Sequence, residues 1–198
     1  MFENTATGIS RIAERIRSSP GQNWLLTGVV NSGKSFCLKY LVNMLNRDDA
    51  TPYAGGLISE AVYLKDEKAG YRGINMITGD TLPLALREDL GPDMALGVFG
   101  VPPDVYETSG KDLIVGRWRV FSSGLKGGID ALFDAVSAGC ALVVLDEFGP
   151  LEISGDGFRH AVDSLFIRNI PFLLVVRLSL VDQVMKVYPS IAVLHTCP

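Results

Sequence analysis

Residues 28–35 read GVVNSGKS, a spacing of glycine, lysine and serine that suits the binding of phosphate groups. The two glycines allow a tight turn in which successive backbone N–H groups point inward at phosphate oxygens. Lys34 can reach the β- and γ-phosphates, and the hydroxyl of Ser35 can bind Mg²⁺. A helix that begins near Phe36 adds the partial positive charge of its N-terminus. The segment therefore predicts a phosphate loop (Walker A pattern) between a strand and a helix.

An acidic pair follows an apolar run in ALVVLDEFGPLE, residues 141–152. The apolar run predicts a buried strand, so Asp146 falls at the carboxyl edge of the sheet, where ligands bind in open α/β folds. We expect its carboxylate to hold Mg²⁺, through water. Glu147 points away from Asp146 in an ideal strand, but at a strand end it can lean toward the γ-phosphate and polarise a water. One acid for the metal and one for water favour hydrolysis.

The predicted nucleotide site combines these two segments. Lys34 and Glu147 are the expected catalytic residues there, and Ser35 and Asp146 are the expected metal ligands. The expected nucleotide-binding residues are Gly28, Val29, Val30, Asn31, Ser32, Gly33, Lys34, Ser35, Phe36, Val143, Val144, Leu145, Asp146, Glu147, Phe148, Gly149 and Pro150.

Hydrolysis of a triphosphate also needs a positive group beside the charge that develops on the γ-phosphate. Arg117 is our catalytic candidate, because Arg117 and Arg119 share one face if 117–121 is a strand. Arg72 is a further candidate, and Arg177 marks the carboxyl end of another predicted strand. The alternative for each is a surface charge on an edge strand.

The N-terminal part of the chain alternates between helix and strand patterns. Ile9, Ile12 and Ile16 recur at helical spacing in residues 8–17 and predict a short amphipathic helix. The continuous apolar run before Gly28 predicts a strand buried on both faces. A helix of about three turns follows the phosphate loop.

The middle of the chain is broken more often. Residues 54–64 and 71–78 predict two strands joined as a hairpin. The interruptions GD, GP, VPP and SGKD predict an extended, loop-rich insertion at 79–115. Short strands are expected near 95–99 and 117–121.

Strands and helices alternate regularly after Gly128. This order indicates a mostly parallel sheet with helices on both faces. The expected helices lie within 129–139, 158–169 and 179–189, and the expected strands lie within 140–150, 170–177 and 190–195.

Composition and charge argue against several other classes of protein. The chain has 198 residues, of which 47% are apolar and 20% charged, as in one globular domain. The net charge of −4 excludes a large nucleic-acid footprint. The longest apolar run, 170–176, is short of the ~20 residues of a membrane helix, and the N-terminus lacks the apolar stretch of a secretory signal. Three cysteines without CxxC spacing argue against a zinc site or a disulfide framework. We expect a cytoplasmic protein without membrane partners.

Four segments come in the same order as in the small nucleoside-triphosphatases first named for thermophilic members, a family with a cancer-related homologue in animals. The segments are GVVNSGKS, AGGLISEAVYLKDEKAGYRGINMITGD, VGRWRV and LVVLDEFGPLEISGDGF. The chain resembles this family over residues 24–195, and DEFGPLE is the most specific part. Two departures are the 20 or so residues before the first strand and the loop residues VVNS, where relatives often carry Pro and Gly.

The resemblance implies an α/β fold of three layers, a P-loop NTPase of the class with a catalytic Glu beside the metal-binding Asp. From the chain length and the sequence pattern we expect one domain over 1–198, with a helical extension at 1–20 and a β-hairpin or loop insertion. The implied reaction is Mg²⁺-dependent hydrolysis of ATP, GTP and other nucleoside triphosphates to diphosphate and phosphate, with low base selectivity. Lys34 and Ser35 match the family's phosphate-loop pair, Asp146 and Glu147 its acidic pair, and Glu152 a second acid.

Two other functions use the same loop and metal. A nucleotide or nucleoside kinase would pass the γ-phosphate to a second substrate bound under 79–115. Such kinases usually carry an arginine-rich lid, and this segment holds only Arg87, so hydrolysis is favoured. A slow nucleotide-dependent switch or accessory protein would instead present a conformation to a protein partner, for which the isoleucine face of the N-terminal helix is the candidate surface.

Overall fold

The computed structural model describes residues 2–28, 34–47, 50–108 and 112–195. The strands in these ranges are β1 (Trp24–Gly28), β2 (Ala54–Leu64), β3 (Glu67–Asn75), β4 (Thr81–Arg87), β5 (Leu113–Val115), β6 (Trp118–Val120), β7 (Leu142–Leu145), β8 (Phe172–Arg177) and β9 (Ala192–His195). The helices are α1 (Phe2–Arg17), α2 (Lys34–Leu45), α3 (Gly91–Phe99), α4 (Pro103–Thr108), α5 (Ser122–Ser137), α6 (Pro150–Ile153), α7 (Arg159–Ile167) and α8 (Val181–Val187), with 3₁₀ turns η1 (Glu88–Leu90) and η2 (Leu178–Leu180).

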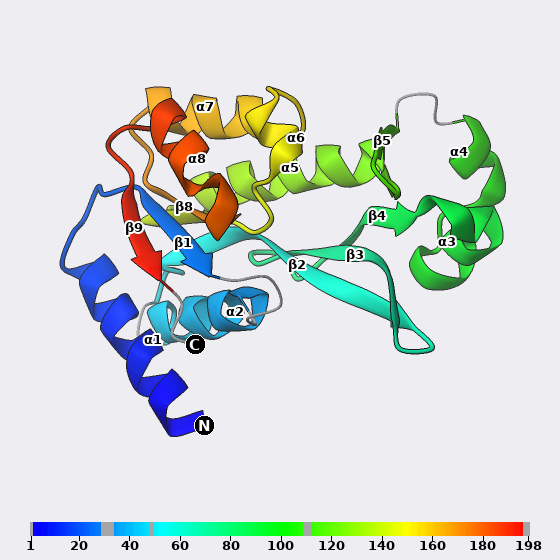
Figure 1. The fold of residues 1–198 in the computed structure, drawn as a ribbon. Coiled ribbons are helices and arrows are strands. Elements are labelled where there is room, and N and C mark those ends of the chain that lie inside the picture. Colours follow the sequence, from blue (N-terminus) through cyan, green and yellow to red (C-terminus); the bar gives the residue numbers. More distant parts are fainter. Residues whose placement is uncertain (1, 29–33, 48–49, 109–111, 196–198) are drawn as a thin grey trace.

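The described strands form one sheet in the order β5-β6-β4-β3-β2-β7-β8-β1-β9. The five strands from β2 to β9 in this order are parallel, and the others pair antiparallel. Figure 1 shows α1 and α2 on one face of the parallel part and α5, α7 and α8 on the other. The predicted α/β fold with helices on both faces is confirmed. Among the described helices, none is both long and apolar enough to cross a membrane.

Alternating side chains of the parallel strands feed two cores. In β7, Val143 and Leu145 pack under α5 and α7, whereas Leu142 and Val144 face α1 and α2. Such strands are buried on both faces, which explains their continuous apolar runs. The two cores hold the carboxyl ends of β1, β7 and β8 at one edge of the sheet.

Helix α1 packs its apolar stripe inward. Ile9, Ala13 and Ile16 are buried in the same core as residues of α2. The isoleucine face, expected to be a candidate surface for a protein partner, is therefore covered within the chain. The sequence pattern alone does not distinguish these two uses, because an amphipathic helix presents the same stripe in both.

Beyond Leu57, strand β2 leaves its parallel neighbour β7 and pairs only with β3. We call residues 58–120 the arm; it contains the outer half of β2, the antiparallel strands β3 to β6, and helices α3 and α4. A small core under α3 and α4 contains Leu86, Tyr106 and Phe121. Figure 1 shows the arm projecting from the parallel part of the sheet.

The expectation of a loop-rich segment at 79–115 with a strand near 95–99 is wrong. The segment forms β4, η1, α3, α4 and β5, and residues 95–99 belong to α3. The Gly-Pro pair that suggested a break stands at the helix start, and Gly100, at φ 69°, caps its end. Proline in the first turn and a left-handed glycine after the last are favourable at helix ends. The strand expected near 117–121 is present as β6.

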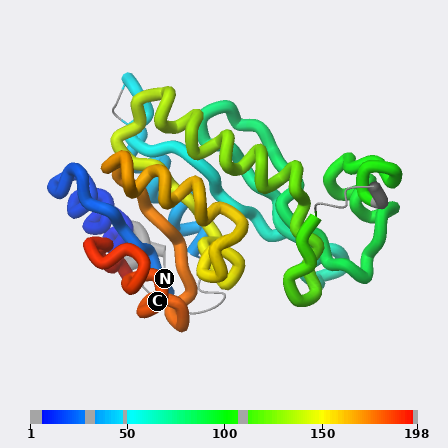
Figure 2. Tube along the Cα trace, turned by 90° about the horizontal axis from the view of Figure 1, so that it is seen from above, coloured from blue at the N-terminus to red at the C-terminus, as the bar shows by residue number. Residues whose placement is uncertain are grey.

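Helix α5 ties the arm to the rest of the molecule. Figure 2 shows it running from the parallel part of the sheet to the arm. Near its start, Gly124 lies so close to β4 that a Cβ atom there would collide with the carbonyl oxygen of Pro83. This close approach fixes the arm against α5.

Replacing Gly124 with alanine tests this contact. We expect Gly124→Ala to lower the free energy of unfolding by about 1–3 kcal/mol, because backbone must move to admit the methyl group. Gly97→Ala is the matched control, since Gly97 is also helical and a Cβ there meets nothing within 4 Å. That change should leave stability unaltered or raise it by up to about 1 kcal/mol. Equal effects of the two substitutions in urea unfolding would contradict the close approach.

Candidate active site

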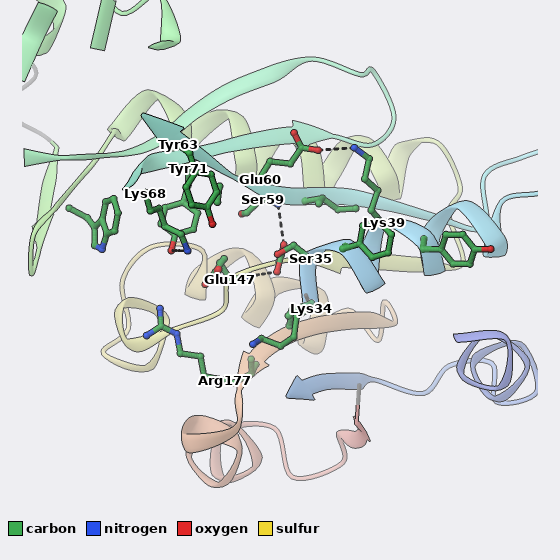
Figure 3. A pocket seen from close by; sticks show the side chains of 18 of the residues that line it. Lys34, Ser35, Lys39, Ser59, Glu60, Tyr63, Lys68, Tyr71, Glu147 and Arg177 are labelled. Carbon is green, nitrogen blue, oxygen red and sulfur yellow. Dashed lines mark hydrogen bonds and ion pairs between the residues drawn. The ribbon is translucent and has the colours of Figure 1, made fainter. Parts of the chain in front are cut away.

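A cleft of about 1170 Å³ lies at the carboxyl edge of the parallel strands and continues along α2 into the arm. Lys34, Ser35, Asp146 and Glu147 all line it. Figure 3 shows Lys34, Ser35 and Glu147 around its centre and Arg177 beside them. The structure thus brings together Lys34 and Ser35 of the first predicted segment with Asp146 and Glu147 of the second.

Asp146 follows β7 directly and is only 1% exposed. Its carboxylate accepts hydrogen bonds from the backbone N–H of Ser59 at 3.3 Å and of Glu147 at 3.0 Å, and from the side chain of Ser35. Burial, and secondly the nearby charge of Glu147, raise the pKa of Asp146 to about 7. A buried carboxylate of this kind gains strongly from a cation beside it.

Lys34 and Ser35 begin α2, directly after the segment 29–33. The Lys34 ammonium donates a hydrogen bond to the carbonyl oxygen of Gly28 at 3.3 Å, across the ends of that segment. The predicted nucleotide contacts at Val29, Val30, Asn31, Ser32 and Gly33 lie outside the described residues. Lys34 and Ser35, which follow the segment directly, line the cleft.

The donor set at this point fits Mg²⁺. A carboxylate and a hydroxyl, already hydrogen-bonded to each other, are the hard oxygen ligands that Mg²⁺ prefers. Among the described residues, no cluster of three or more His, Cys, Asp or Glu side chains could hold a metal alone. Mg²⁺ usually takes one or two protein ligands and completes its shell with water and substrate phosphates.

Glu147 is exposed to the cleft because the chain turns there. Its φ is 65°, in the left-handed region that favours glycine. The sequence prediction placed Glu147 on an extended strand end, but β7 stops at Leu145. The turn, and not the alternation of a strand, directs the Glu147 side chain into the cleft.

Glu152 stabilises the turn through hydrogen bonds to its backbone. It is 4% exposed, and it accepts hydrogen bonds from the backbone N–H of Gly149 at 2.8 Å and of Phe158 at 3.3 Å. Burial raises the pKa of Glu152. The second acid of the DEFGPLE block therefore acts on the backbone, positioning the turn that carries Glu147.

Several residues expected to bind nucleotide lie elsewhere. Val143, Val144, Leu145 and Phe148 are buried in the two cores, so they position the acidic pair and do not line the cleft. The prediction included them because they flank Asp146 in sequence. Gly149 and Pro150 line a second cavity of about 160 Å³ next to the cleft.

Of the four arginines considered, two line the cleft and two do not. Arg119 lies on β6 and donates to Glu88 with two bonds of 2.9 Å, and Arg72 lies on β3 outside the cleft lining. Arg117 lines the cleft from the turn before β6, so it does not share a strand face with Arg119. Arg177 also lines the cleft, at the end of β8, where its backbone is in register with Gly28.

Three exposed aromatic residues line the cleft, and two of them, Tyr40 and Tyr63, were not among the expected site residues. Phe36, which was expected to bind nucleotide, is 61% exposed, Tyr40 39% and Tyr63 58%. The buried residues of α2 are Cys37, Leu38, Leu41, Val42 and Leu45. The signal was that Phe36 and Tyr40 fall one position off this stripe and share their own face at i, i+4 spacing.

Comparison with known proteins gives consistent matches. The model of a protein family described as NTPase matches residues 23–195. By sequence, the nucleoside-triphosphatase THEP1 of Natranaerobius thermophilus is 26% identical over 152 residues, or 76% of this chain and 72% of that protein. By structure, a human cancer-related nucleoside triphosphatase matches with a TM-score of 0.59 at 18% identity over 88% of both chains. THEP1 from Aquifex aeolicus matches with a TM-score of 0.58 at 18% identity, over 89% of this chain and 91% of that one. These structural matches show a shared fold.

The raised pKa of Asp146 predicts a pH dependence of stability. Its pKa of about 7 in the folded chain lies above the ordinary 3.8, so the folded chain binds a proton that the unfolded chain releases between these values. The stabilisation is complete below pH 3.8 and is lost as pH rises through about 7. In metal-free buffer, the free energy of unfolding should therefore fall more steeply with pH in the wild type than in Asp146→Asn.

Urea unfolding at a series of pH values, with a chelator present, measures this slope. Asp182→Asn is the control, since Asp182 is exposed on α8, away from the cleft. Its slope should equal that of the wild type. Parallel curves for the wild type and Asp146→Asn would contradict the assigned pKa.

Proposed function

This chain belongs to the NTPase family, and we propose that it hydrolyses nucleoside 5′-triphosphates, among them ATP and GTP, with Mg²⁺ and little selectivity for the base. The family matches confirm the sequence resemblance to small nucleoside-triphosphatases. The observation that carries the proposal is the convergence of Lys34, Ser35, Asp146 and Glu147 on one cleft. Both segments that the sequence singled out contribute to it.

The phosphate end of the substrate would be held by three residues. Lys34 stands at the first position of α2, where its ammonium and the helix N-terminus both favour negative charge. Ser35 and Asp146 would hold the metal, which supplies charge neutralisation between the β- and γ-phosphates. Because Asp146 is buried and already oriented by two backbone N–H groups, little reorganisation is needed at the moment of reaction.

Glu147 would orient and deprotonate the attacking water. Its carboxylate is exposed to the cleft, and no side-chain hydrogen bond of Glu147 occurs among the described residues. A base must be within hydrogen-bond reach of its water, and a carboxylate without competing partners meets that need. Glu152 keeps the Glu147 turn in place during the reaction.

The charge that develops on the γ-phosphate needs a cation, and we assign this role to Arg177. Its backbone is in register with Gly28, at the start of the phosphate loop. Arg117, the candidate from sequence, lies on the arm, with its guanidinium 5.0 Å from the centre of the Trp118 ring. The place of Arg177 at the end of β8, beside the residue that precedes the expected phosphate loop, favours it over Arg117.

Two further parts of the proposal concern the whole chain. We propose that residues 1–198 form one domain with α1 as an extension, because the cores on both faces share the same parallel strands. We also propose a cytoplasmic location, which fits a nucleoside triphosphate substrate and the reduced thiol of Cys140.

The direct test is phosphate release from ATP, GTP, CTP and UTP with Mg²⁺ and no second substrate. Turnover of all four is expected. Lys34→Ala should lose nucleotide binding, whereas Glu147→Gln should keep it and lower kcat by roughly 10²–10⁴-fold through loss of the base. Binding is measured with a non-hydrolysable analogue.

Lys186→Ala and Glu14→Gln are matched controls, since both residues are exposed outside the cleft. Both variants should keep wild-type turnover. Wild-type hydrolysis by Glu147→Gln would refute its role as base, and no turnover of any nucleotide by the wild type would refute the proposed function.

A further inference from the structure

The cleft extends well beyond the residues that hydrolysis requires. On the arm it is walled by Tyr63, Lys68, Tyr71, Arg117 and Trp118, which we call the arm wall. The rings of Tyr71 and Trp118 meet edge to face with centroids 5.3 Å apart. The Lys68 ammonium lies 5.1 Å from the Tyr71 ring centre, and Arg117 stacks on Trp118. Figure 3 shows Tyr63, Lys68 and Tyr71 at one side of the cleft and Lys34 and Arg177 at the other, with Glu147 between them.

The strand order places the arm wall beyond β7 and Glu147, on the side of the sheet away from β1. Moving along the sheet from β1, which leads into the phosphate loop, one passes β8, then β7 with Glu147, then β2 and β3 of the arm. In phosphoryl transfer, the attacking and leaving oxygens lie roughly in line on opposite sides of the γ-phosphorus. The nucleophile therefore comes from the side of Glu147 and the arm, and the leaving diphosphate lies toward β1.

The cleft as a whole, with the triphosphate site included, is larger than a water molecule or one small ligand needs. A water occupies about 30 Å³, and a pocket for one small ligand measures roughly 300–1,000 Å³. The cleft of about 1170 Å³ is larger than that range. The cavity of about 160 Å³ next to it shares Tyr71, Trp118 and Glu147, and is otherwise lined mainly by apolar side chains such as Leu84 and Val120.

The charge of the cleft points to an anion. Its described lining contains five cations and three carboxylates: Lys34, Lys39, Lys68, Arg117 and Arg177 against Glu60, Asp146 and Glu147. This local excess of two positive charges stands in a chain of net charge −4. Lys39 is paired with Glu60 at 2.7 Å, and the triphosphate site uses Lys34 and Arg177. Lys68 and Arg117 are left on the arm, beside exposed or half-buried aromatic rings.

We propose that the arm wall binds a nucleoside monophosphate as a phosphoryl acceptor, so that the protein also transfers the γ-phosphate to a second nucleotide. Aromatic rings stack on a base whatever its identity, and cations beside them bind its phosphate. A phosphate oxygen of the acceptor forms a bond to the γ-phosphorus. The bond from that phosphorus to the β,γ-bridging oxygen breaks, and its electron pair stays on the departing diphosphate. One triphosphate and one monophosphate thus give two diphosphates.

This inference rests on the proposed function, because the same residues place the γ-phosphate. It differs in its need for Glu147. Water must be deprotonated, whereas an ionised phosphate monoester already carries the attacking negative charge. Glu147→Gln should therefore lose hydrolysis and keep transfer.

The experiment uses the full chain with Mg²⁺, ATP labelled at the γ-phosphate, and AMP, GMP, CMP or UMP. Labelled phosphate and labelled nucleoside diphosphate are separated and counted. We expect labelled diphosphate from at least one monophosphate, in the wild type and in Glu147→Gln. Tyr63→Ser should raise the KM for that monophosphate about tenfold or more, with the KM for ATP unchanged within about twofold.

Ile167→Ser is the matched control, since Ile167 is 76% exposed on α7, away from the cleft, and this change should alter neither KM. Label that moves only to water, with all four monophosphates, overturns the inference and leaves hydrolysis standing. Label that moves only to a monophosphate overturns hydrolysis and supports the inference. A raised KM for ATP in Tyr63→Ser shows that the arm wall binds the base of the triphosphate itself, and overturns the inference. If no label moves, both proposals fail.

Discussion

The hydrogen bonds to the buried carboxylate of Asp146 connect three parts of the chain that are far apart in sequence. Ser35 comes from the start of α2, Ser59 from β2 where the arm begins, and Glu147 from the turn after β7. The acid is almost fully enclosed, so its charge is costly until a cation lies beside it. The three hydrogen bonds orient the carboxylate and partly stabilise its charge, whereas its burial disfavours that charge, so a cation beside it would be strongly favourable.

Strand β2 connects the parallel part of the sheet to the arm. Its first half is a parallel strand buried on both faces, and its second half is an antiparallel strand of the arm. The arm therefore lies beside the carboxyl edge of the parallel strands, and residues of both line the cleft. Gly124 and α5 fix that opening by bringing the arm against the rest of the molecule. The cleft forms because β2 pairs parallel with β7 in its first half and antiparallel with β3 in its second half.

The parts of the site that depend on local chemistry could be predicted from sequence. Lys34 and Ser35 line the cleft at the start of α2, as their spacing predicted, and Asp146 follows β7, as a carboxylate after an apolar run does. The predictions that were wrong concern residues whose position depends on tertiary contacts. Glu147 reaches the cleft through a left-handed turn that Glu152 stabilises by a hydrogen bond. Val143, Val144, Leu145 and Phe148 are so close to Asp146 in sequence that the pattern did not separate core residues from residues of the site.

The arm was harder to predict because its signals have two meanings. Gly-Pro can break a chain or begin a helix, and only the packing of α3 against Leu86 and Phe121 decides between them. Tyr40 was not expected in the site, because an aromatic residue on an amphipathic helix commonly packs into the core. It is exposed because the opposite face of α2 packs on the sheet.

The central claim is that Asp146 couples metal to nucleotide. Its most direct test is the dissociation constant of a non-hydrolysable nucleoside triphosphate with and without Mg²⁺, in the wild type and in Asp146→Asn. The account predicts that Mg²⁺ tightens binding to the wild type by about 5–150-fold, the usual range of coupling between two ligands, and that this gain disappears in the variant. An equal gain in both proteins would contradict it.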